Sequence, residues 1–197
     1  MSRTEWKSSC LLAPLPAVLI SCGTIEKPNA MTAAWVGIIN STPEKTYVSI
    51  RKERYSHEII GNNGEFVINL TTAAMVKAVD YCGVRTGRNE NKIEKTGLTV
   101  SESFKLSAPS IGEAPVSLEC KVTDIVELGS HDMFLADIVS VSVDDYFIDE
   151  SGKLRLEKAK LLAYAHGEYF ELGNKIGRFG FSVMKKKTLK RINKNKK

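Results

Sequence analysis

Asn29-Ala30-Met31-Thr32-Ala33-Ala34-Trp35 is the most informative run in this sequence of 197 residues. Its amide and hydroxyl groups offer hydrogen-bond donors and acceptors, and its small alanines let a flat ligand approach the backbone. In an extended chain Met31, Ala33 and Trp35 point to the same side, where the indole can wall a planar slot. The alternative interpretation is a barrel strand whose tryptophan lies in the core.

The run Ser49-Ile50-Arg51-Lys52-Glu53-Arg54-Tyr55-Ser56 falls where one strand is expected to end and a helix to begin. The start of a helix presents free N–H groups and a positive dipole end, which suit a phosphate. Arg51 and Arg54 add fork-shaped, charge-assisted donors for phosphate oxygens. The alternative is a solvated charged turn in which Ser56 only caps the helix.

Two weaker polar signals lie further along the chain. Residues 83–92 (GVRTGRNENK) predict a basic loop that can clamp a polar ligand edge with Lys92, although ordinary charged loops have the same composition. His131 falls in an expected turn, from which it can donate a hydrogen bond to a ligand. A lone histidine in a turn is more commonly just exposed to solvent.

Alternating hydrophobicity predicts that most of the body consists of β-strands. In residues 116–128 and 133–143 apolar side chains recur at every second position, so each strand has one buried and one wetter face. A compact turn at residues 129–132 joins the two strands into an antiparallel hairpin. Further strands are expected at residues 17–22, 31–39, 46–50 and 65–70, and short helices at residues 55–62 and 72–82. This combination favours a barrel over a doubly wound α/β sheet.

The length and the charge distribution predict one domain, residues 1–184, followed by a basic tail, residues 185–197. The tail holds eight of the 28 Lys and Arg residues, which leaves twenty basic residues against 23 acidic ones in the body. Such a tail is expected to be solvated and disordered, and no nucleic acid is expected as a partner. The alternative is a tail that binds nucleic acid or an acidic partner.

The cysteines and the N-terminal region indicate a cytoplasmic protein. The four cysteines, Cys10, Cys22, Cys82 and Cys120, show no C-x-x-C spacing, so we expect neither a metal site nor a disulfide framework. Residues 19–22 (LISC) resemble a lipoprotein cleavage box. Because the preceding apolar run is short and holds two prolines, we interpret it as the first core strand. No run is long enough to span a membrane.

Several nucleotide-binding and hydrolytic motifs are missing from the sequence. It has no G-x-G-x-x-G after a strand, no G-x-x-x-x-G-K-[ST], no H-E-x-x-H and no G-x-S-x-G. A Rossmann domain, a P-loop NTPase, a zincin and an α/β-hydrolase are therefore disfavoured. Any cofactor must be held by another arrangement.

Taken together, these segments resemble the flavin reductase-like family, and most closely its flavoredoxin-type members. The resemblance spans roughly residues 11–181. It runs in the order PAVLISC, NAMTAAW, YVSIRKERYSHEII, EFVINL, YCGVRTGRNENK, GL, LECKV and GSHDMFLADIV. Each piece alone is unspecific, whereas N-x-M-T-x-x-W combined with S-I-R at a strand end is specific.

The resemblance implies a mainly β fold: a six-stranded Greek-key split β-barrel with a few short helices, which dimerises and binds FMN near the dimer interface. It implies that Asn29, Ala30, Met31, Thr32 and Trp35 bind the cofactor by lining the isoalloxazine ring or the approach to its phosphate, and that Ser49, Arg51 and Ser56 lie near the phosphate. It also implies that Lys92 reaches the ribityl chain or ring edge, that His131 stands by the ring, and that Tyr164 and Tyr169 are further ring neighbours. The chain departs from the family's usual G-E-V at Ala136-Asp137-Ile138, where the lost glycine can tighten the packing.

Two reductive functions follow from this resemblance. The first is an NAD(P)H-dependent flavin reductase, with NADH or NADPH as electron donor and a catalytic residue that we do not assign. The second is a flavoredoxin-like carrier that exchanges electrons with a redox protein and uses no nicotinamide. A function of another class is a non-enzymatic binding module that uses the basic tail.

Overall fold

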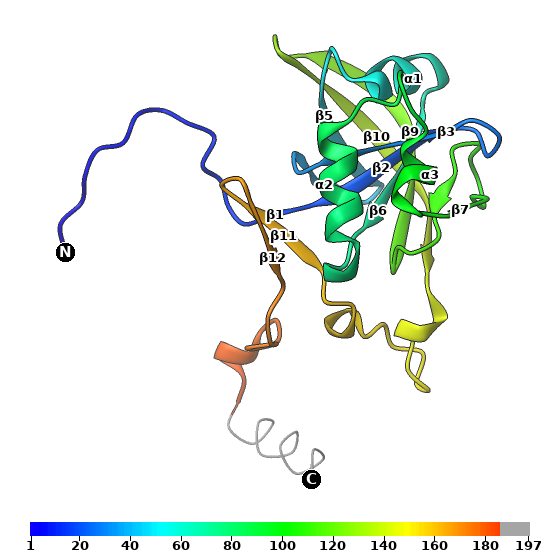
Figure 1. The fold of residues 1–197 in the computed structure, drawn as a ribbon. Coiled ribbons are helices and arrows are strands. Elements are labelled where there is room, and N and C mark those ends of the chain that lie inside the picture. The colour runs from blue at the N-terminus through cyan, green and yellow to red at the C-terminus, as the bar shows by residue number, and fades with distance from the viewer. Residues whose placement is uncertain (186–197) are drawn as a thin grey trace.

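The structure, a computed structural model, describes residues 1–185, so the expected tail lies outside the described residues except for Lys185. The fold is mainly β, with a few short helices packed against a curled sheet (Figure 1). The strands are β1 (Leu15–Pro16), β2 (Val18–Gly23), β3 (Pro28–Ala33), β4 (Val36–Ser41), β5 (Glu44–Arg51), β6 (Glu65–Leu70), β7 (Val100–Ser101), β8 (Ser110–Ile111), β9 (Val116–Glu127), β10 (His131–Val143), β11 (Leu162–Ala165) and β12 (Glu168–Glu171). The helices are α1 (Tyr55–Asn63), α2 (Val76–Val84) and α3 (Lys92–Thr96), with single 3₁₀ turns at Ala73–Met75, Asp145–Phe147, Leu156–Lys158 and Phe181–Val183.

The main sheet is antiparallel throughout and has the order β3-β2-β6-β9-β10-β5-β4. The prediction of a mainly β split barrel is confirmed, but this sheet has seven strands where six were expected. The difference arises in residues 31–39, for which the sequence predicts a single strand. The chain breaks there at Ala34 and Trp35 into the end of β3 and the start of β4.

This break brings the two margins of the sheet together. β3 pairs with β2 at one margin and β4 pairs with β5 at the other, so two consecutive strands form both margins. The Ser49 N–H donates a hydrogen bond of 2.9 Å to the Trp35 carbonyl, which ties the corner to β5. The sheet therefore curls around its own core as an open barrel.

The fold has two apolar clusters, one on each face of β2. Since successive side chains of a strand point to opposite faces, Val18, Ile20 and Cys22 enter the barrel core, whereas Ala17 and Leu19 enter the second cluster. The barrel core also contains Phe66 and Phe134, both fully buried. The second cluster packs α2 and α3 against the outside of the sheet and so places these helices beside β3.

The expected helices are present with shifted boundaries. The helix predicted at residues 55–62 is α1, which ends one residue later because Gly64 takes the left-handed conformation, φ 70°. The helix predicted at residues 72–82 begins as a 3₁₀ turn and continues as α2 to Val84. The short helix α3 was not expected.

A second, three-stranded sheet, β1-β11-β12, projects from the body, and residues 1–14 extend beyond it (Figure 1). Neither β11 nor β12 was expected. They form a tight hairpin whose two turn residues, His166 and Gly167, both have positive φ, 51° and 91°. The strand expected at residues 17–22 is present as β2, whereas Leu11 and Leu12, in the apolar run that the sequence assigns to the same core strand, are exposed.

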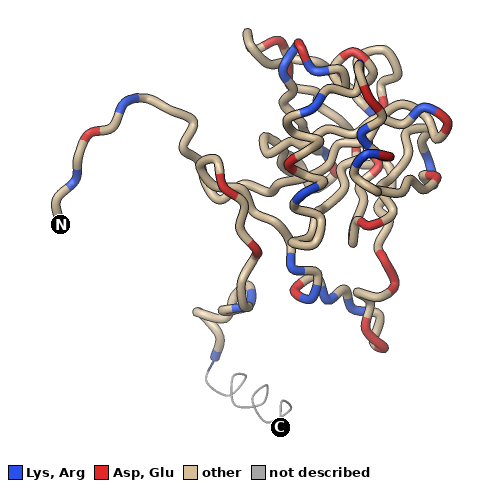
Figure 2. The backbone as a smooth tube through the Cα atoms, viewed as in Figure 1, with Lys and Arg blue, Asp and Glu red and all other residues tan. Residues whose placement is uncertain are grey.

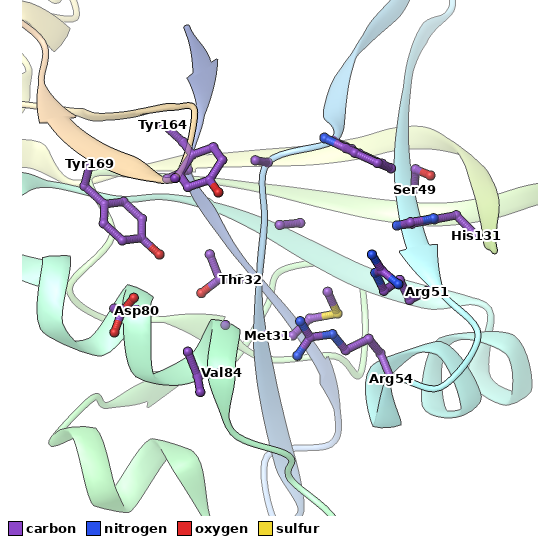
Figure 3. Close-up of a pocket in the computed structure, with 16 residues that line it drawn as sticks. Met31, Thr32, Ser49, Arg51, Arg54, Asp80, Val84, His131, Tyr164 and Tyr169 are labelled. Carbon is purple, nitrogen blue, oxygen red and sulfur yellow. The ribbon is translucent and has the colours of Figure 1, made fainter. Parts of the chain in front are cut away.

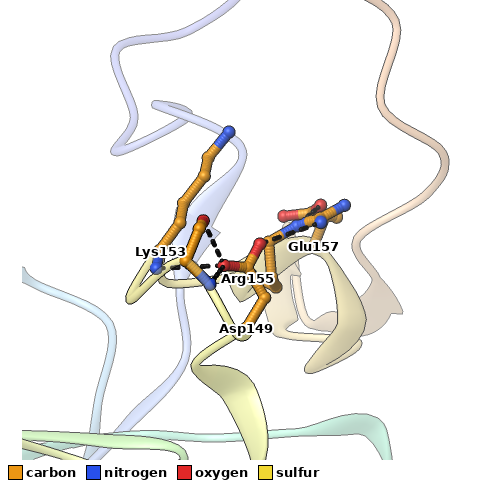
Figure 4. A network of polar contacts seen from close by, with 5 residues as sticks. Asp149, Lys153, Arg155 and Glu157 are labelled. Carbon is orange, nitrogen blue, oxygen red and sulfur yellow. Dashed lines mark hydrogen bonds and ion pairs between the residues drawn. The ribbon is translucent and has the colours of Figure 1, made fainter. Parts of the chain in front are cut away.

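The carboxylate of Asp149 accepts several hydrogen bonds that hold the loop between β10 and β11 together (Figure 4). Asp149 accepts hydrogen bonds from the Ser151 N–H and hydroxyl (3.0 and 2.6 Å), the Lys153 N–H (3.2 Å) and the Arg155 guanidinium (3.3 Å). Arg155 also pairs with Glu157 at 2.7 Å. These contacts close a loop that leads the chain from the main sheet to the second sheet.

Charges of both signs alternate along the described backbone (Figure 2). At the departure from the usual family pattern, Ala136 is fully buried in the barrel core and Asp137 forms an ion pair with Lys45 across β10 and β5. Neither residue lines the cleft described below. None of the helices in residues 1–185 is long and apolar enough to cross a membrane.

Candidate functional site

A cleft of about 420 Å³ opens beside the corner between β3 and β4 (Figure 3). Its walls come from the ends of β3 and β5, the starts of β4 and β10, the helix α2 and the β11–β12 hairpin. The lining residues are Ala17, Met31, Thr32, Ala33, Ala34, Trp35, Ser49, Arg51, Arg54, Asp80, Gly83, Val84, His131, Tyr164, Gly167 and Tyr169. Segments that lie far apart in the sequence therefore meet in this cleft.

One wall of the cleft consists of two stacked rings. The centroids of the Trp35 and His131 rings lie 4.5 Å apart, and their planes are tilted by 35°. Partial burial and the positive charge of Arg51 lower the pKa of His131, against a smaller opposing effect of Glu53. Trp35 remains 40% exposed, so its indole is available to a flat ligand.

Positive charge gathers at the end of the cleft nearest to this wall. Figure 3 shows the Arg51 and Arg54 side chains there, below His131 and beside Met31. Arg51 is more than half exposed, and its ion pair with Glu53 is long, 3.7 Å. The Arg51 guanidinium is thus available to an anionic ligand, and the half-buried Arg54 lines the cleft beside it.

A second pocket of about 270 Å³ adjoins the cleft and shares Met31 and Arg54 with it. It lies at the start of α1, where no side chain caps the free N–H groups of the first turn. Ser56 lines the pocket and is buried, and the Asn29 amide donates a hydrogen bond of 2.7 Å to its hydroxyl. This pocket therefore concentrates donors for an anion.

Lys92 forms the basic floor of the second pocket. Its side chain is buried, and its ammonium donates to the carbonyls of Cys82 (3.4 Å) and Arg85 (3.2 Å). Burial lowers the pKa of Lys92. Gly87 lines the same pocket, and an added Cβ there would lie 2.1 Å from the Asn29 amide oxygen, so the loop closes over the pocket only with glycine.

The opposite end of the cleft carries a negative charge. Asp80 of α2 lies there with Thr32, Tyr164 and Tyr169 (Figure 3). The two tyrosines are cross-strand partners in the β11–β12 hairpin, with ring centroids 5.6 Å apart. Thr32 donates to the Val79 carbonyl and so fixes α2 against β3.

The residues that the sequence singled out fall into three groups. Met31, Thr32, Trp35, Ser49, Arg51, His131 and Tyr164 line the cleft, and Ser56 and Lys92 line the adjoining pocket with Met31. Asn29 lies behind the pocket, where it bonds Ser56, and faces a third cavity instead. Ala30 is fully buried in the second apolar cluster and lines neither cavity.

Sequence reasoning did not single out Asp80, Val84 and Arg85. Arg54, which the sequence offered as a donor for phosphate oxygens, lines both the cleft and the adjoining pocket. Asp80 and Val84 lie on the exposed side of a helix, where such residues are ordinarily solvated. Only the packing of α2 against β3 brings them to the cleft.

The combined arrangement suits a planar ligand that carries a phosphate. The cleft offers an aromatic wall and small side chains, and the pocket offers Arg54, Lys92 and helix N–H groups. No cysteine lines the cleft, and Asp80 is its one carboxylate, so neither thiol nucleophilic catalysis nor paired-carboxylate hydrolysis is supported. Among residues 1–185, no three His, Cys, Asp or Glu side chains gather to hold a metal ion.

Comparisons with known proteins point to a flavin-related family. Residues 11–173 match the Flavin reductase like domain. An uncharacterised protein of Archaeoglobus fulgidus is 43% identical over 138 residues, which cover 70% of this chain and 77% of that protein.

Two solved structures extend the similarity to the fold of nearly the whole chain. The flavoredoxin of Desulfovibrio vulgaris (Miyazaki F) superposes with a TM-score of 0.86 at 30% identity, and that of Methanosarcina acetivorans with 0.81 at 27%. Each alignment covers 93% of this chain and 100% of the flavoredoxin.

Proposed function

This chain belongs to the family defined by the Flavin reductase like domain, and we propose that it binds FMN and uses it as an NAD(P)H-dependent flavin reductase. The observation that carries the proposal is the junction of the two cavities at Met31 and Arg54. A flat slot and a basic pocket meet there, as the ring and the phosphate of one FMN molecule require.

In this proposal the phosphate occupies the second pocket. Ser56, Arg54 and Lys92 surround that space, and the N–H groups at the start of α1 face it. Ser49 and Arg51 lie at the passage into the cleft, along which the ring contacts Met31, Thr32 and Trp35. His131 stacks behind the indole and holds it in place.

When bound, FMN would supply the redox chemistry, as the acceptor of the hydride that converts NAD(P)H to NAD(P)⁺. The protein contributes position and charge. The guanidinium groups of Arg51 and Arg54 stabilise negative charge on the reduced ligand. The neutral imidazole of His131 adds no further positive charge to this end of the cleft.

A flavoredoxin-like carrier is the second candidate. It is favoured by the similarity to two flavoredoxins and by the exposure of Trp35, through which electrons can pass to a redox protein. The four cysteines are all free, which fits the reducing cytoplasm expected from the sequence. A binding module that works through the basic tail is the candidate of another class.

We further propose a homodimer. Several large apolar side chains in the strands of the main sheet and of the projecting second sheet, or directly beside these strands, are exposed in the single chain: Ile38, Ile39, Ile125, Leu128, Val139, Val141, Phe170 and Leu172. Pairing through a two-fold axis covers the same apolar surface of both subunits at once. The extended residues 1–14 supply further apolar surface, including Trp6 and Leu12.

The absorbance spectrum of the purified protein, followed by anaerobic mixing with electron donors, tests the function. A flavin band supports the cofactor, and a colourless protein that binds no added FMN contradicts it. Bleaching of that band by NADH or NADPH supports the reductase. Bleaching by a ferredoxin-like donor alone supports the carrier, and no bleaching by any donor contradicts both redox functions.

A further inference from the structure

The acidic end of the cleft contains a carboxylate, that of Asp80, which the proposed FMN site does not use. Asp80 lies opposite the two arginines, at the far end of the same cavity (Figure 3). Its carboxylate is exposed and takes part in no ion pair within the described residues. A charged group therefore faces the cleft without a protein cation to balance it.

The neighbours of Asp80 leave this end of the cleft with acceptors rather than donors. The Thr32 hydroxyl already donates its proton to the Val79 carbonyl. The Tyr169 hydroxyl points toward the Asp80 carboxylate (Figure 3), and burial together with that carboxylate raises the pKa of Tyr169. The Thr32 proton is donated to Val79 and the Tyr169 hydroxyl is directed at Asp80, so the oxygens of Tyr169 and Asp80 are left as acceptors for a ligand.

The positions of these groups are held by the fold. The Thr32 hydrogen bond fixes α2 on β3 one residue before Asp80. Tyr169 stands on β12 opposite Tyr164, in a hairpin whose turn is set by His166 and Gly167. A helix and a hairpin thus present a preorganised set of acceptors, which suits selective recognition.

We propose that Asp80, with Tyr169, is the recognition site for the carboxamide of a nicotinamide nucleotide, that Thr32 positions Asp80 by fixing α2, and that Asp80 determines specificity for the carboxamide. This inference rests on the proposed function. The carboxamide carries an –NH₂ group that needs an acceptor, and the oxidised ring carries a positive charge that a carboxylate attracts. A ligand with an anionic group in this position would be rejected by Asp80.

The contribution of the carboxamide to binding can be measured with an analogue of the nucleotide that lacks this group. 3-Acetylpyridine adenine dinucleotide has a methyl ketone in place of the carboxamide and is otherwise identical to NAD⁺. A site built to accept an N–H discriminates against a ligand that lacks it. Equilibrium binding of the two oxidised nucleotides to FMN-loaded protein, followed by flavin fluorescence, needs no electron transfer and measures this discrimination directly.

The expected result is that wild-type protein binds NAD⁺ about tenfold more tightly than the acetylpyridine analogue. Asp80→Ala removes the acceptor and should bring this ratio close to one. Asp80→Asn removes the charge but keeps an oxygen acceptor, so it should weaken both nucleotides while preserving part of the ratio. Asp145→Asn, an exposed and remote acidic position, should behave as wild type.

Other outcomes overturn the inference. Equal affinity of the wild-type protein for the two nucleotides, or an unchanged ratio in Asp80→Ala, shows that Asp80 does not recognise the carboxamide. Loss of FMN in Asp80→Ala shows instead that Asp80 belongs to the flavin site. If NAD⁺ binds as expected but neither NADH nor NADPH reduces the flavin, the reductase function fails while the recognition site stands.

Discussion

The imidazole of His131 stacks against the indole of Trp35, with ring centroids 4.5 Å apart. Trp35 stands at the corner between β3 and β4, and His131 is the first residue of β10, so the contact joins a margin of the sheet to its central hairpin. Burial lowers the pKa of His131 below its ordinary value of 6.5, and the charge of Arg51 lowers it further. The ring is therefore neutral at pH 7.

Replacing Arg51 by Gln should raise the pKa of His131 toward 6.5, because one of its two depressing causes is removed while burial remains. Since the folded state disfavours the protonated ring, wild-type protein should lose stability as the pH falls through 6.5. An NMR titration of the imidazole protons measures the pKa directly. Arg155→Gln serves as the control, and an identical shift in both variants would contradict a local effect.

Replacing Arg51 by Ala should weaken FMN binding. Loss of one charge-assisted hydrogen bond costs about 1.5–3 kcal/mol, which corresponds to roughly ten- to hundredfold in affinity. A fluorescence titration with FMN measures the change, and Arg155→Ala tests whether loss of any exposed arginine has the same effect. Unchanged affinity would remove Arg51 from the site.

The purified chain should have twice its monomer mass of 21.8 kDa by light scattering at micromolar concentration. The physical reason is the exposed apolar surface on both sheets, since burial of such surface drives association. Val141→Asp places a charge on the main sheet and Phe170→Asp places one on the second sheet. The variant that becomes monomeric identifies the sheet that forms the interface. A monomer that still binds FMN would contradict the dimer.

A chain truncated after Met184 should keep its flavin and its mass relative to the full-length protein. The removed segment, residues 185–197, has Leu189 and Ile192 as its apolar residues, which is too little to form a core contact of its own. Absorbance and light scattering of the truncated chain check both properties. Loss of bound flavin would show that the tail packs against the body.

Replacing Asp149 by Ala should loosen the loop before β11 without changing flavin affinity. Hydrogen bonds from Ser151 and from the Lys153 backbone, together with Arg155, hold the pKa of Asp149 well below its ordinary value. The loop is thus stabilised above the ordinary carboxyl pKa and should loosen as acid protonates Asp149. Hydrogen exchange of the amides between Ile148 and Leu156 reports the loosening. Equal exchange in variant and wild type would show that the contacts are dispensable.

Most of the fold could be predicted because its strands have one buried and one wetter face. The alternation in β9 and β10 reflects this arrangement directly. The corner at Ala34 and Trp35 could not be predicted, because neither residue breaks a strand by itself. It depends on the hydrogen bond from Ser49, which exists only after β5 has folded beside it.

The candidate site could be predicted where its chemistry lies in local runs. The cleft-lining residues of β3 and the start of α1 occur in two short segments, each with recognisable donors and small side chains. Asp80 could not be found in this way, and Tyr169 was indicated only by the family resemblance. Asp80 is exposed on α2 and Tyr169 is half-buried on β12, and only the packing of α2 and the β11–β12 hairpin directs them to one cavity.

The corner between β3 and β4 also determines which proteases can cleave the chain between these two strands. No Lys or Arg occurs between Lys27 and Lys45, so trypsin has no cleavage point within the segment that forms both margins of the sheet. Chymotrypsin does have one, at the half-exposed Trp35. A single cut after Trp35 would break the covalent connection between β3 and β4. The barrel could then open between these two margins of the sheet.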